Sequence, residues 1–340
     1  EAMDRISDGT VVSTRVRLAR NLEGYPFPSH LKGEKQAKEI IRLVSSALSR
    51  LDEFRLVYMD SISGEEAVCL MENHLISPNL INNKRYSAAL INREENVSVM
   101  INEEDHLREQ CIVKGLDLRL AYDTMSEIDN RIAGSMKFAF DEQLGFLTAC
   151  PTNLGTGLRA SVMLFLPALT INGFIPKVIR SISRLGLTVR GVYGEGSEAD
   201  GYKYQISNEV TLGVSEEEIL ASVEEVVDKV CELEQTERRN LKQGKDALDI
   251  QDECLRAYGV VTNCAKISTR EFVNLTAKVK LGACLGYINI PDVSAIDDLV
   301  LKLSPSNITA AAQKSLTAVE RDVYRAQYSA KAFKKMTNQP

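Results

Sequence analysis

Arginines that stand in short polar motifs are the first candidates for chemistry in this chain. Arg15 and Arg17 are separated by one residue, so in an extended segment their side chains point to the same side. Arg159 follows a loop that contains one proline and two glycines. Guanidinium groups bind phosphate oxygens through paired hydrogen bonds. Several such arginines together would suit a polyphosphate, although Arg15 and Arg17 alone are explained equally well by a solvated edge strand.

A thiol, Cys150, ends an apolar strand-like run and opens the loop that leads to Arg159. A helical pattern follows at residues 161–169, so loop amides, a helix N-terminus and an arginine predict an anion site beside a reactive group. The polar loop favours an exposed thiol with a lowered pKa. A hydrolase-type nucleophile would need a positioned histidine, and His74 or His106 could approach in space. A buried, inert cysteine is the common alternative.

Three consecutive acids, Glu103, Glu104 and Asp105, follow an alternating pattern at residues 96–102 that predicts a half-buried strand of an antiparallel sheet. Neighbouring carboxylates repel one another unless a cation lies close. Magnesium or a guanidinium group could be that cation, and an acid-rich helix N-terminus is the alternative. A glycine-rich loop around Glu195 allows close approach to a ligand, or is an ordinary turn.

The remaining patterns define the elements that would position these residues. Strand patterns occur at residues 54–59, 86–92, 96–102, 145–149 and 187–193, and a helical pattern occurs at residues 116–132. Because strands and helices do not alternate strictly, we expect an α+β fold. Ser215 and Glu218 form a capping-box pattern, after which helical patterns dominate to residue 335. We therefore predict a domain boundary near residue 235.

Composition excludes several classes of function. The net charge of -6 gives no overall attraction to nucleic acid or anionic membranes. The sequence shows neither a membrane-spanning apolar run nor a signal-peptide pattern. Seven cysteines without C-x-x-C spacing and only three histidines indicate a reduced, cytoplasmic protein without a zinc site. Neither a Walker loop nor the protein-kinase motifs are present, so phosphoryl transfer would depend on arginines.

Four ordered blocks resemble the phosphagen kinase family of creatine and arginine kinases: STRVR from residue 13, NEEDHLR from residue 102, CPTNLGTGLRAS from residue 150 and RGVYGEG from residue 190. The resemblance implies a catalytic domain at residues 10–237, built as an antiparallel sheet flanked by helices, with ATP and Mg2+ as cofactors. It implies that the nucleotide is bound by Ser13, Thr14, Arg15, Val16, Arg17, His74, Arg108, Arg159, Ala160, Ser161, Val162, Met163, Arg190, Gly191, Val192, Tyr193, Gly194 and Glu195.

The same resemblance implies that Glu104 and Glu195 would hold the acceptor guanidinium. Of these two carboxylates, we assign Glu104 as the catalytic base and Glu195 as the orienting partner. Cys150 would lie beside that guanidinium, and Glu103 would reach the nucleotide-bound magnesium through water. These roles are chemically reasonable, because arginine keeps its proton above pH 12 and needs carboxylates to fix and deprotonate one nitrogen.

The chain departs from the small-molecule kinases, which carry a helical domain before the first block, whereas only fourteen residues precede Arg15 here. It has a C-terminal helical extension instead, at residues 238–340, and so is similar to bacterial protein arginine kinases. Without a lid over a small substrate, a protein side chain could enter the site. The extension contains Arg321, Asp322, Arg325 and Ala326, which resemble a phosphoarginine-binding, allosteric motif. Taken without the family, the same residues would be a solvated helical face.

We interpret the sequence as a protein arginine kinase that transfers the γ-phosphoryl group of ATP to arginine side chains. The resemblance implies a homodimer, protein substrates with exposed arginines, the repressor CtsR, the activator McsA and the ClpC–ClpP protease, for which phosphoarginine marks proteins for degradation. Two alternatives remain: a kinase for free arginine or another small guanidine, and a non-catalytic phosphoarginine-binding adaptor. A cysteine hydrolase ranks last, because it leaves the arginines unexplained.

Overall fold

The structure is a computed structural model that describes residues 8–31, 33–49, 54–82, 86–191 and 200–337. Its strands are β1 (Val11–Arg20), β2 (Phe54–Tyr58), β3 (Ala88–Asn92), β4 (Val97–Ile101), β5 (Leu107–Lys114), β6 (Phe140–Asp141), β7 (Gly145–Phe146), β8 (Leu158–Phe165), β9 (Leu187–Gly191) and β10 (Lys203–Asn208). Its α-helices are α2 (Glu34–Leu48), α3 (Gly64–Glu72), α4 (Pro78–Asn82), α5 (Leu118–Ala133), α6 (Pro167–Ile171), α7 (Ile175–Ser183), α8 (Glu216–Gln243), α9 (Ala247–Asn263), α10 (Thr269–Cys284), α11 (Ser294–Lys302), α12 (Pro305–Ala312) and α13 (Ala318–Thr337).

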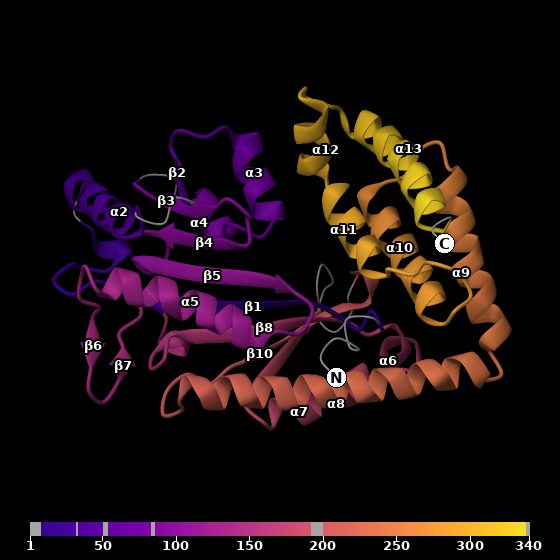
Figure 1. Cartoon of the computed structure of the whole chain (residues 1–340), viewed down its shortest axis with the longest axis horizontal. Helices are drawn as coiled ribbons and strands as arrows, with labels where there is room; N and C mark the ends of the chain where they lie inside the picture. The colour runs from indigo at the N-terminus through magenta and orange to yellow at the C-terminus, as the bar shows by residue number, and fades with distance from the viewer. Residues whose placement is uncertain (1–7, 32, 50–53, 83–85, 192–199, 338–340) are drawn as a thin grey trace. The chain divides into compact units, whose positions relative to one another are not determined.

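Eight strands form one sheet in the order β2-β3-β4-β5-β1-β8-β10-β9 (Figure 1). The pairs from β2 to β5 and the pair of β1 with β5 are antiparallel, which confirms the predicted α+β class. Because β1 lies between β5 and β8, the edge-strand interpretation of Arg15 and Arg17 is wrong. The predicted capping box is confirmed, since Ser215 N donates to Glu218 and Glu218 N donates to Ser215 Oγ.

Three predictions of secondary structure or exposure need correction. Residues 161–169 read as a helix, but β8 continues to Phe165 and α6 begins only at Pro167. Arg159 therefore lies within a strand, and not before a helix N-terminus. The alternating pattern of β4 predicts one exposed face, whereas all five of its residues are buried. The predicted strand at residues 145–149 is reduced to the two residues of β7.

The chain folds into two compact units that do not follow its order. We call Ser13–Ser161 with Ser207–Glu224 the strand unit, and Glu1–Val12 with Val162–Ile206 and Glu225–Pro340 the helical unit. The domain boundary implied at residue 237 falls within α8.

Helices cover part of one sheet face in the strand unit. A buried cluster joins α3 and α4 to β2, β3 and β4, with Leu70, Leu80, Ala89 and Met100 among its members. Met100 lies opposite Arg108 in the pairing of β4 with β5, so this cluster shares its face of the sheet with Arg108. The cluster ends at β4. Beyond it, the same face carries Arg108 and Gln110 on β5 and Arg15 and Arg17 on β1.

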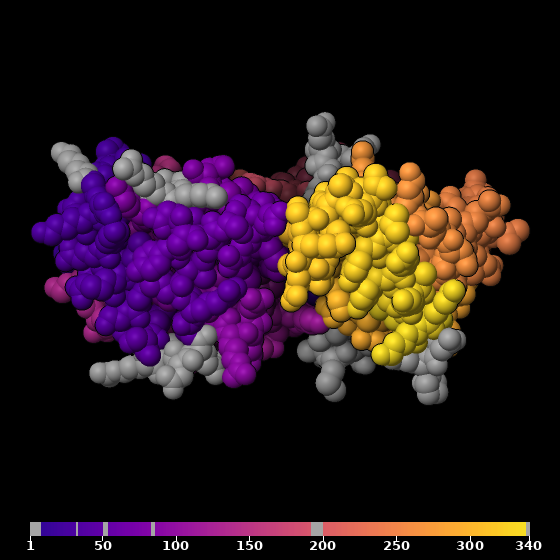
Figure 2. Space-filling model, turned by 90° about the horizontal axis from the view of Figure 1, so that it is seen from above, coloured from indigo at the N-terminus to yellow at the C-terminus, as the bar shows by residue number. Residues whose placement is uncertain are grey.

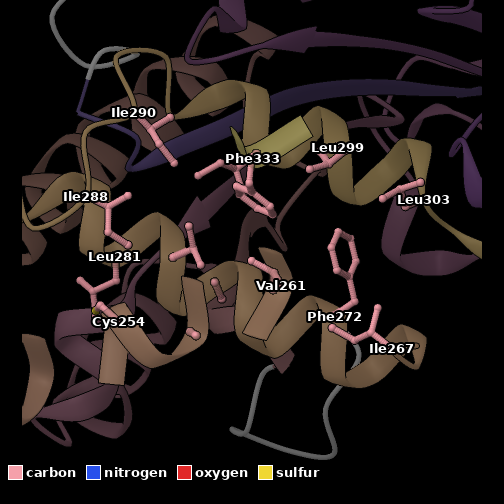
Figure 3. Packing of buried hydrophobic residues seen from close by; sticks show 14 of the residues in the cluster. Cys254, Val261, Ile267, Phe272, Leu281, Ile288, Ile290, Leu299, Leu303 and Phe333 are labelled. Atoms are coloured by element: carbon pink, nitrogen blue, oxygen red, sulfur yellow. The ribbon is translucent and has the colours of Figure 1, made fainter. Parts of the chain in front are cut away.

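The helical unit has its own core between α9, α10, α11 and α13. Phe272, Leu299 and Phe333 are fully or almost fully buried in it (Figure 3). Helix α13, yellow in Figure 2, also presents residues at the surface of this unit. Across the described residues, no helix combines the length and apolar character that crossing a membrane requires.

Candidate active site

Three arginine side chains project from the same face of the sheet because of the residue register between β1 and β5. Arg17 lies opposite Gln110, and Ala19 lies opposite Arg108. Directly opposed residues of an antiparallel pair project to the same side, as do alternate residues of one strand. Arg15, Arg17 and Arg108 therefore share a face, as the spacing of the first two predicts. We call these three residues and Arg159 the arginine cluster.

Arg159 joins this cluster from β8. Its Nη2 donates to Ser207 Oγ at 3.3 Å, and its charge lowers the pKa values of both Arg15 and Arg17. On the same strand, Ser161 Oγ donates to Arg15 O at 3.2 Å. The residues of β8 that alternate with Arg159 point to the opposite face of the sheet and pack into the core, as Ala160 does, which is completely buried.

The cluster lacks sufficient negative charge of its own. Burial, followed by repulsion from Arg108 and Arg159, lowers the pKa of Arg15 to about 10. Burial and the three neighbouring arginines lower the pKa of Arg17 well below its usual value, and only Glu103 opposes this. Arg17 Nε is buried and has no hydrogen-bond partner among the described residues. A bound polyphosphate would supply both the missing acceptor and the missing counter-charge.

Thr14 and Val16 of β1 are also predicted to bind the nucleotide, but they can contribute to such a site only through their backbone atoms or through packing. Thr14 is completely buried, and its Oγ1 donates to Gly115 O at 2.7 Å. Val16 is also completely buried in the core. Both alternate with Arg15 and Arg17, so their side chains face away from the arginine cluster.

The predicted acids occupy a tight turn between β4 and β5, residues 102–106, which we call the acidic turn. Asn102 N donates to His106 O at 2.9 Å and Glu103 N donates to Asp105 O at 3.2 Å, closing the turn. Asn102 has φ of 60°, a left-handed conformation that asparagine tolerates. The turn thus presents Glu103 and Glu104 at the end of the strand pair that carries Arg108.

Glu103 and Glu104 have different surroundings. Glu103 is buried, and Arg108 Nη1 donates to both of its carboxylate oxygens at 3.1 Å. Glu104 is exposed at the tip of the turn. Partial desolvation, and then the negative charges of Asp105 and Glu103, raise the pKa of Glu104. A carboxylate with a raised pKa is a stronger proton acceptor, which suits a general base.

Two residues of the acidic turn hold it in place, and the sequence did not single them out for that role. Asp105 Oδ1 accepts hydrogen bonds from Asn21 Nδ2 and Ala149 N, both at 2.6 Å. His106 Nδ1 accepts from Leu22 N, so its Nε2 donates to Pro26 O. Burial lowers the pKa of His106 to about 4. With both ring nitrogens occupied, His106 does not serve as the base of a cysteine hydrolase.

Cys150 lies on the loop that Asp105 ties to the acidic turn. The bond from Ala149 N to Asp105 is one residue away, and Thr148 Oγ1 donates to Cys150 O at 2.8 Å. The thiol is half-buried, and its Sγ lies 3.0 Å from Thr152 Oγ1. The structure therefore brings together two of the sequence blocks, NEEDHLR from residue 102 and CPTNLGTGLRAS from residue 150. Cys150 lies near the turn that carries Glu104.

A glycine allows this loop to reach its neighbour. Gly155 has φ of 106°, and a Cβ atom there would lie 2.2 Å from Thr211 O. Thr211 Oγ1 donates to Leu154 O at 2.7 Å and also lies 3.1 Å from Thr152 O, which fastens the loop to the segment after β10. Any side chain at Gly155 would break this contact.

Only the first two residues of the fourth sequence block, RGVYGEG from residue 190, lie within the described residues. Arg190 and Gly191 end β9 in the helical unit, with Arg190 exposed. Val192, Tyr193, Gly194 and Glu195 lie outside the described residues. Val162 and Met163 also belong to the helical unit. The participation of these residues in the nucleotide site stays a prediction.

The predicted phosphoarginine-binding residues lie on α13 of the helical unit. Arg325 is 1% exposed, and it donates to Leu303 O at 3.0 Å, Ile267 O at 2.8 Å and Asp322 Oδ1 at 2.7 Å. Arg321 is half-buried, with Nη1 donating to Leu316 O at 2.6 Å, and Ala326 is completely buried. Arg325 thus ties α13 to the end of α11 and the start of α10. A phosphoryl ligand would compete with these acceptors.

Two family matches together cover most of the chain. Residues 36–237 match the family described as ATP:guanido phosphotransferase, C-terminal catalytic domain. Residues 247–340 match the Protein-arginine kinase McsB C-terminal domain.

Individual relatives agree with these matches. A protein-arginine kinase of Caldanaerobacter subterraneus subsp. tengcongensis is 41% identical over 323 residues, which cover 94% of this chain and 95% of the relative. The solved structure of the duplicated taurocyamine kinase from Schistosoma mansoni with bound transition state analog components has a TM-score of 0.64 and 29% identity. That likeness covers 78% of this chain and only 39% of the duplicated chain. A lombricine kinase structure has a TM-score of 0.59 and 28% identity, covering 69% of this chain and 70% of the other. The chain therefore belongs to the protein-arginine kinase branch of the ATP:guanido phosphotransferase family.

Proposed function

We propose that this enzyme transfers the γ-phosphoryl group of ATP to arginine side chains of proteins, with the arginine cluster binding the nucleotide phosphates. The observation that carries the proposal is the group of mutually repelling, partly buried arginines with an unpaired Arg17 Nε, next to a turn of carboxylates. Phosphoryl transfer has a loose transition state, so cationic stabilisation and positioning supply most of the catalysis. The family membership supports the same chemistry.

Magnesium would enter with the nucleotide. No group of three or more acidic, histidine or cysteine side chains in the described ranges could hold a metal ion by itself. Glu103 is a carboxylate next to Arg108, and carboxylate and phosphate oxygens are the ligands that Mg2+ prefers. Bound Mg2+ would neutralise developing phosphate charge, and we assign Glu103 a contact to it through water.

The acceptor would lie beside the acidic turn. We assign Glu104 as the base, because its pKa is raised and it is exposed at the tip of the turn. Glu195 would fix the guanidinium nitrogen in line with the γ-phosphate, and Cys150 would lie next to that guanidinium without forming a covalent intermediate. Two carboxylates around one guanidinium both orient it and accept the departing proton.

The Glu104 assignment is tested by Glu104→Gln, which keeps the shape of the side chain and removes the base. Transfer should fall by about 10²–10⁴-fold while ATP affinity is retained. Phosphoarginine mass spectrometry on an unfolded protein substrate measures transfer. Glu142→Gln, on the exposed turn between β6 and β7, is the control and should keep full activity. Undiminished transfer by Glu104→Gln would refute the assignment.

The nature of the acceptor needs a separate comparison. The full chain should be incubated with ATP and either free arginine or an unfolded protein. Preferential phosphorylation of protein arginines supports the proposal, whereas faster phosphorylation of free arginine favours the small-guanidine kinase. Binding of phosphoarginine without any ATP turnover would favour the adaptor.

We propose that the helical unit binds phosphoarginine and thereby regulates the enzyme. The proposed binding residues are Arg321, Asp322, Arg325 and Ala326. The match to the McsB C-terminal domain supports this assignment. The proposed partners are CtsR, McsA and the ClpC–ClpP protease, the proposed assembly is a homodimer, and the proposed compartment is the cytoplasm. Arg321→Ala should reduce binding of a phosphoarginine peptide and leave basal transfer unchanged.

A further inference from the structure

The connector between α3 and α4, residues 74–77, is fastened to the sheet beside the active site. Ser98 Oγ of β4 donates to Leu75 O at 2.6 Å, and Gln110 Nε2 of β5 donates to His74 O. Gln110 also donates to Ser98 Oγ at 2.9 Å, so the two buried anchors support each other. His74 has φ of 62°, a conformation that is uncommon outside glycine. The connector is therefore held in one conformation by the sheet below it.

Ser77 ends this connector and contacts the acidic turn. Its hydroxyl donates to Glu103 Oε1 and accepts from Leu80 N at 3.1 Å, which caps α4. A serine hydroxyl has only one proton to donate, and here that proton goes to Glu103. Ser77 is 8% exposed and Glu103 is 6% exposed, so little water is present to replace this bond.

The Glu103 carboxylate is consequently held from two sides. Ser77 holds Oε1, while both contacts from Arg108 to Glu103 use the single nitrogen Nη1. A carboxylate without the hydroxyl would be drawn toward a two-nitrogen fork with the guanidinium, which is the preferred geometry of such pairs. That geometry would occupy more of Arg108 and turn the carboxylate away from its present direction.

We propose that Ser77 is a positioning residue for nucleotide binding: its hydroxyl holds Glu103 so that Arg108 and the carboxylate both remain available to a magnesium-bound nucleotide. This inference rests on the proposed function. The hydroxyl acts through Glu103 and does not touch the substrate. The connector thereby links the packing of α3 and α4 to the electrostatics of the phosphate site.

Ser77→Ala in the full chain tests the proposal, with Ser63→Ala as a matched control. Ser63 caps α3 by accepting from Glu66 N at 3.0 Å, so both changes remove a helix cap, but only Ser77 contacts Glu103. Isothermal titration calorimetry should measure ADP affinity with and without Mg2+. Ser77→Ala should weaken ADP binding in the presence of Mg2+ about tenfold, as expected for loss of a hydrogen bond to a charged group. Without Mg2+ the effect should be smaller.

Ser77→Thr, which keeps the hydroxyl, should restore affinity to within about twofold of the unmodified chain. Ser63→Ala should bind like the unmodified chain even if its Tm falls. Equal Mg2+-dependent affinity in Ser77→Ala and the unmodified chain would overturn the role of Ser77 and leave the proposed function intact. Failure of the unmodified chain to bind ADP at all would instead overturn the proposed function.

Discussion

Arg325→Ala should destabilise the helical unit strongly, whatever ligand that unit binds. Arg325 is 1% exposed and donates to two backbone carbonyls, Leu303 O and Ile267 O, and to Asp322. Truncation leaves both carbonyls and a carboxylate without this donor. Each buried acceptor that loses its partner costs about 1–3 kcal/mol. We therefore expect a loss of roughly 3–5 kcal/mol in the free energy of unfolding.

Urea and thermal denaturation, followed by far-UV circular dichroism, measure this loss. At about 2–4 °C per kcal/mol for a unit of this size, the Tm should fall by roughly 10 °C. The control is Arg321→Ala, on the same helix, where a half-buried side chain loses one hydrogen bond to Leu316 O. That change should cost less than about 1.5 kcal/mol.

A loss below about 1 kcal/mol in Arg325→Ala would refute the reasoning, because it would show that the carbonyls find other partners on truncation. The expected result also affects how ligand experiments are interpreted. Loss of phosphoarginine binding in Arg325→Ala would not by itself demonstrate a ligand contact, whereas the same loss in Arg321→Ala, with the unit still folded, would.

Three further outcomes follow from the strand unit. Arg17→Gln should abolish nucleotide affinity and raise the free energy of unfolding of the unliganded chain. The reason is that a guanidinium whose pKa is lowered by folding destabilises the folded state at neutral pH. Calorimetry and denaturation check the two effects. Asp105→Asn should move the acid limb of the pH–rate profile to lower pH, because Asp105 helps to raise the pKa of Glu104 and a base works only when deprotonated. Gly155→Ala should lower the Tm by several degrees, since its Cβ would lie 2.2 Å from a backbone carbonyl.

Local spacing was enough to predict the features that depend on one segment. Arg15 and Arg17 share a face because alternate strand residues always do, and β1 is a strand. The Ser215 capping box is set by residues three apart. The approach of Cys150 to the acidic turn also agrees with the grouping of the sequence motifs, but the bond from Ala149 N to Asp105 that creates it joins segments far apart in the chain.

Other features depended on which elements of the tertiary structure pack over a segment, and the spacing of residues along the sequence does not reveal this. β8 contains a continuous apolar run because it lies inside the sheet, and such a run resembles a helix in sequence. β4 is buried on the side of its polar residues because α3 and α4 cover that side, with Ser98 bonded to Leu75 O. Arg325 is spaced like a residue on a solvated helical face, yet it is buried among carbonyls.

The division of the chain between the two compact units has a consequence for folding during synthesis. The strand unit contains the arginine cluster and the acidic turn, and its last residues are Ser207–Glu224. Translation therefore delivers every part of this unit before most of α8 and all of α9 to α13 have been made. The helical unit cannot be completed at that stage. Its segment Val162–Ile206 is synthesised early, but the segment with which it packs, Glu225–Pro340, is synthesised last. A nascent polypeptide would acquire its phosphate-binding face first, and the unit that carries the proposed phosphoarginine reader last.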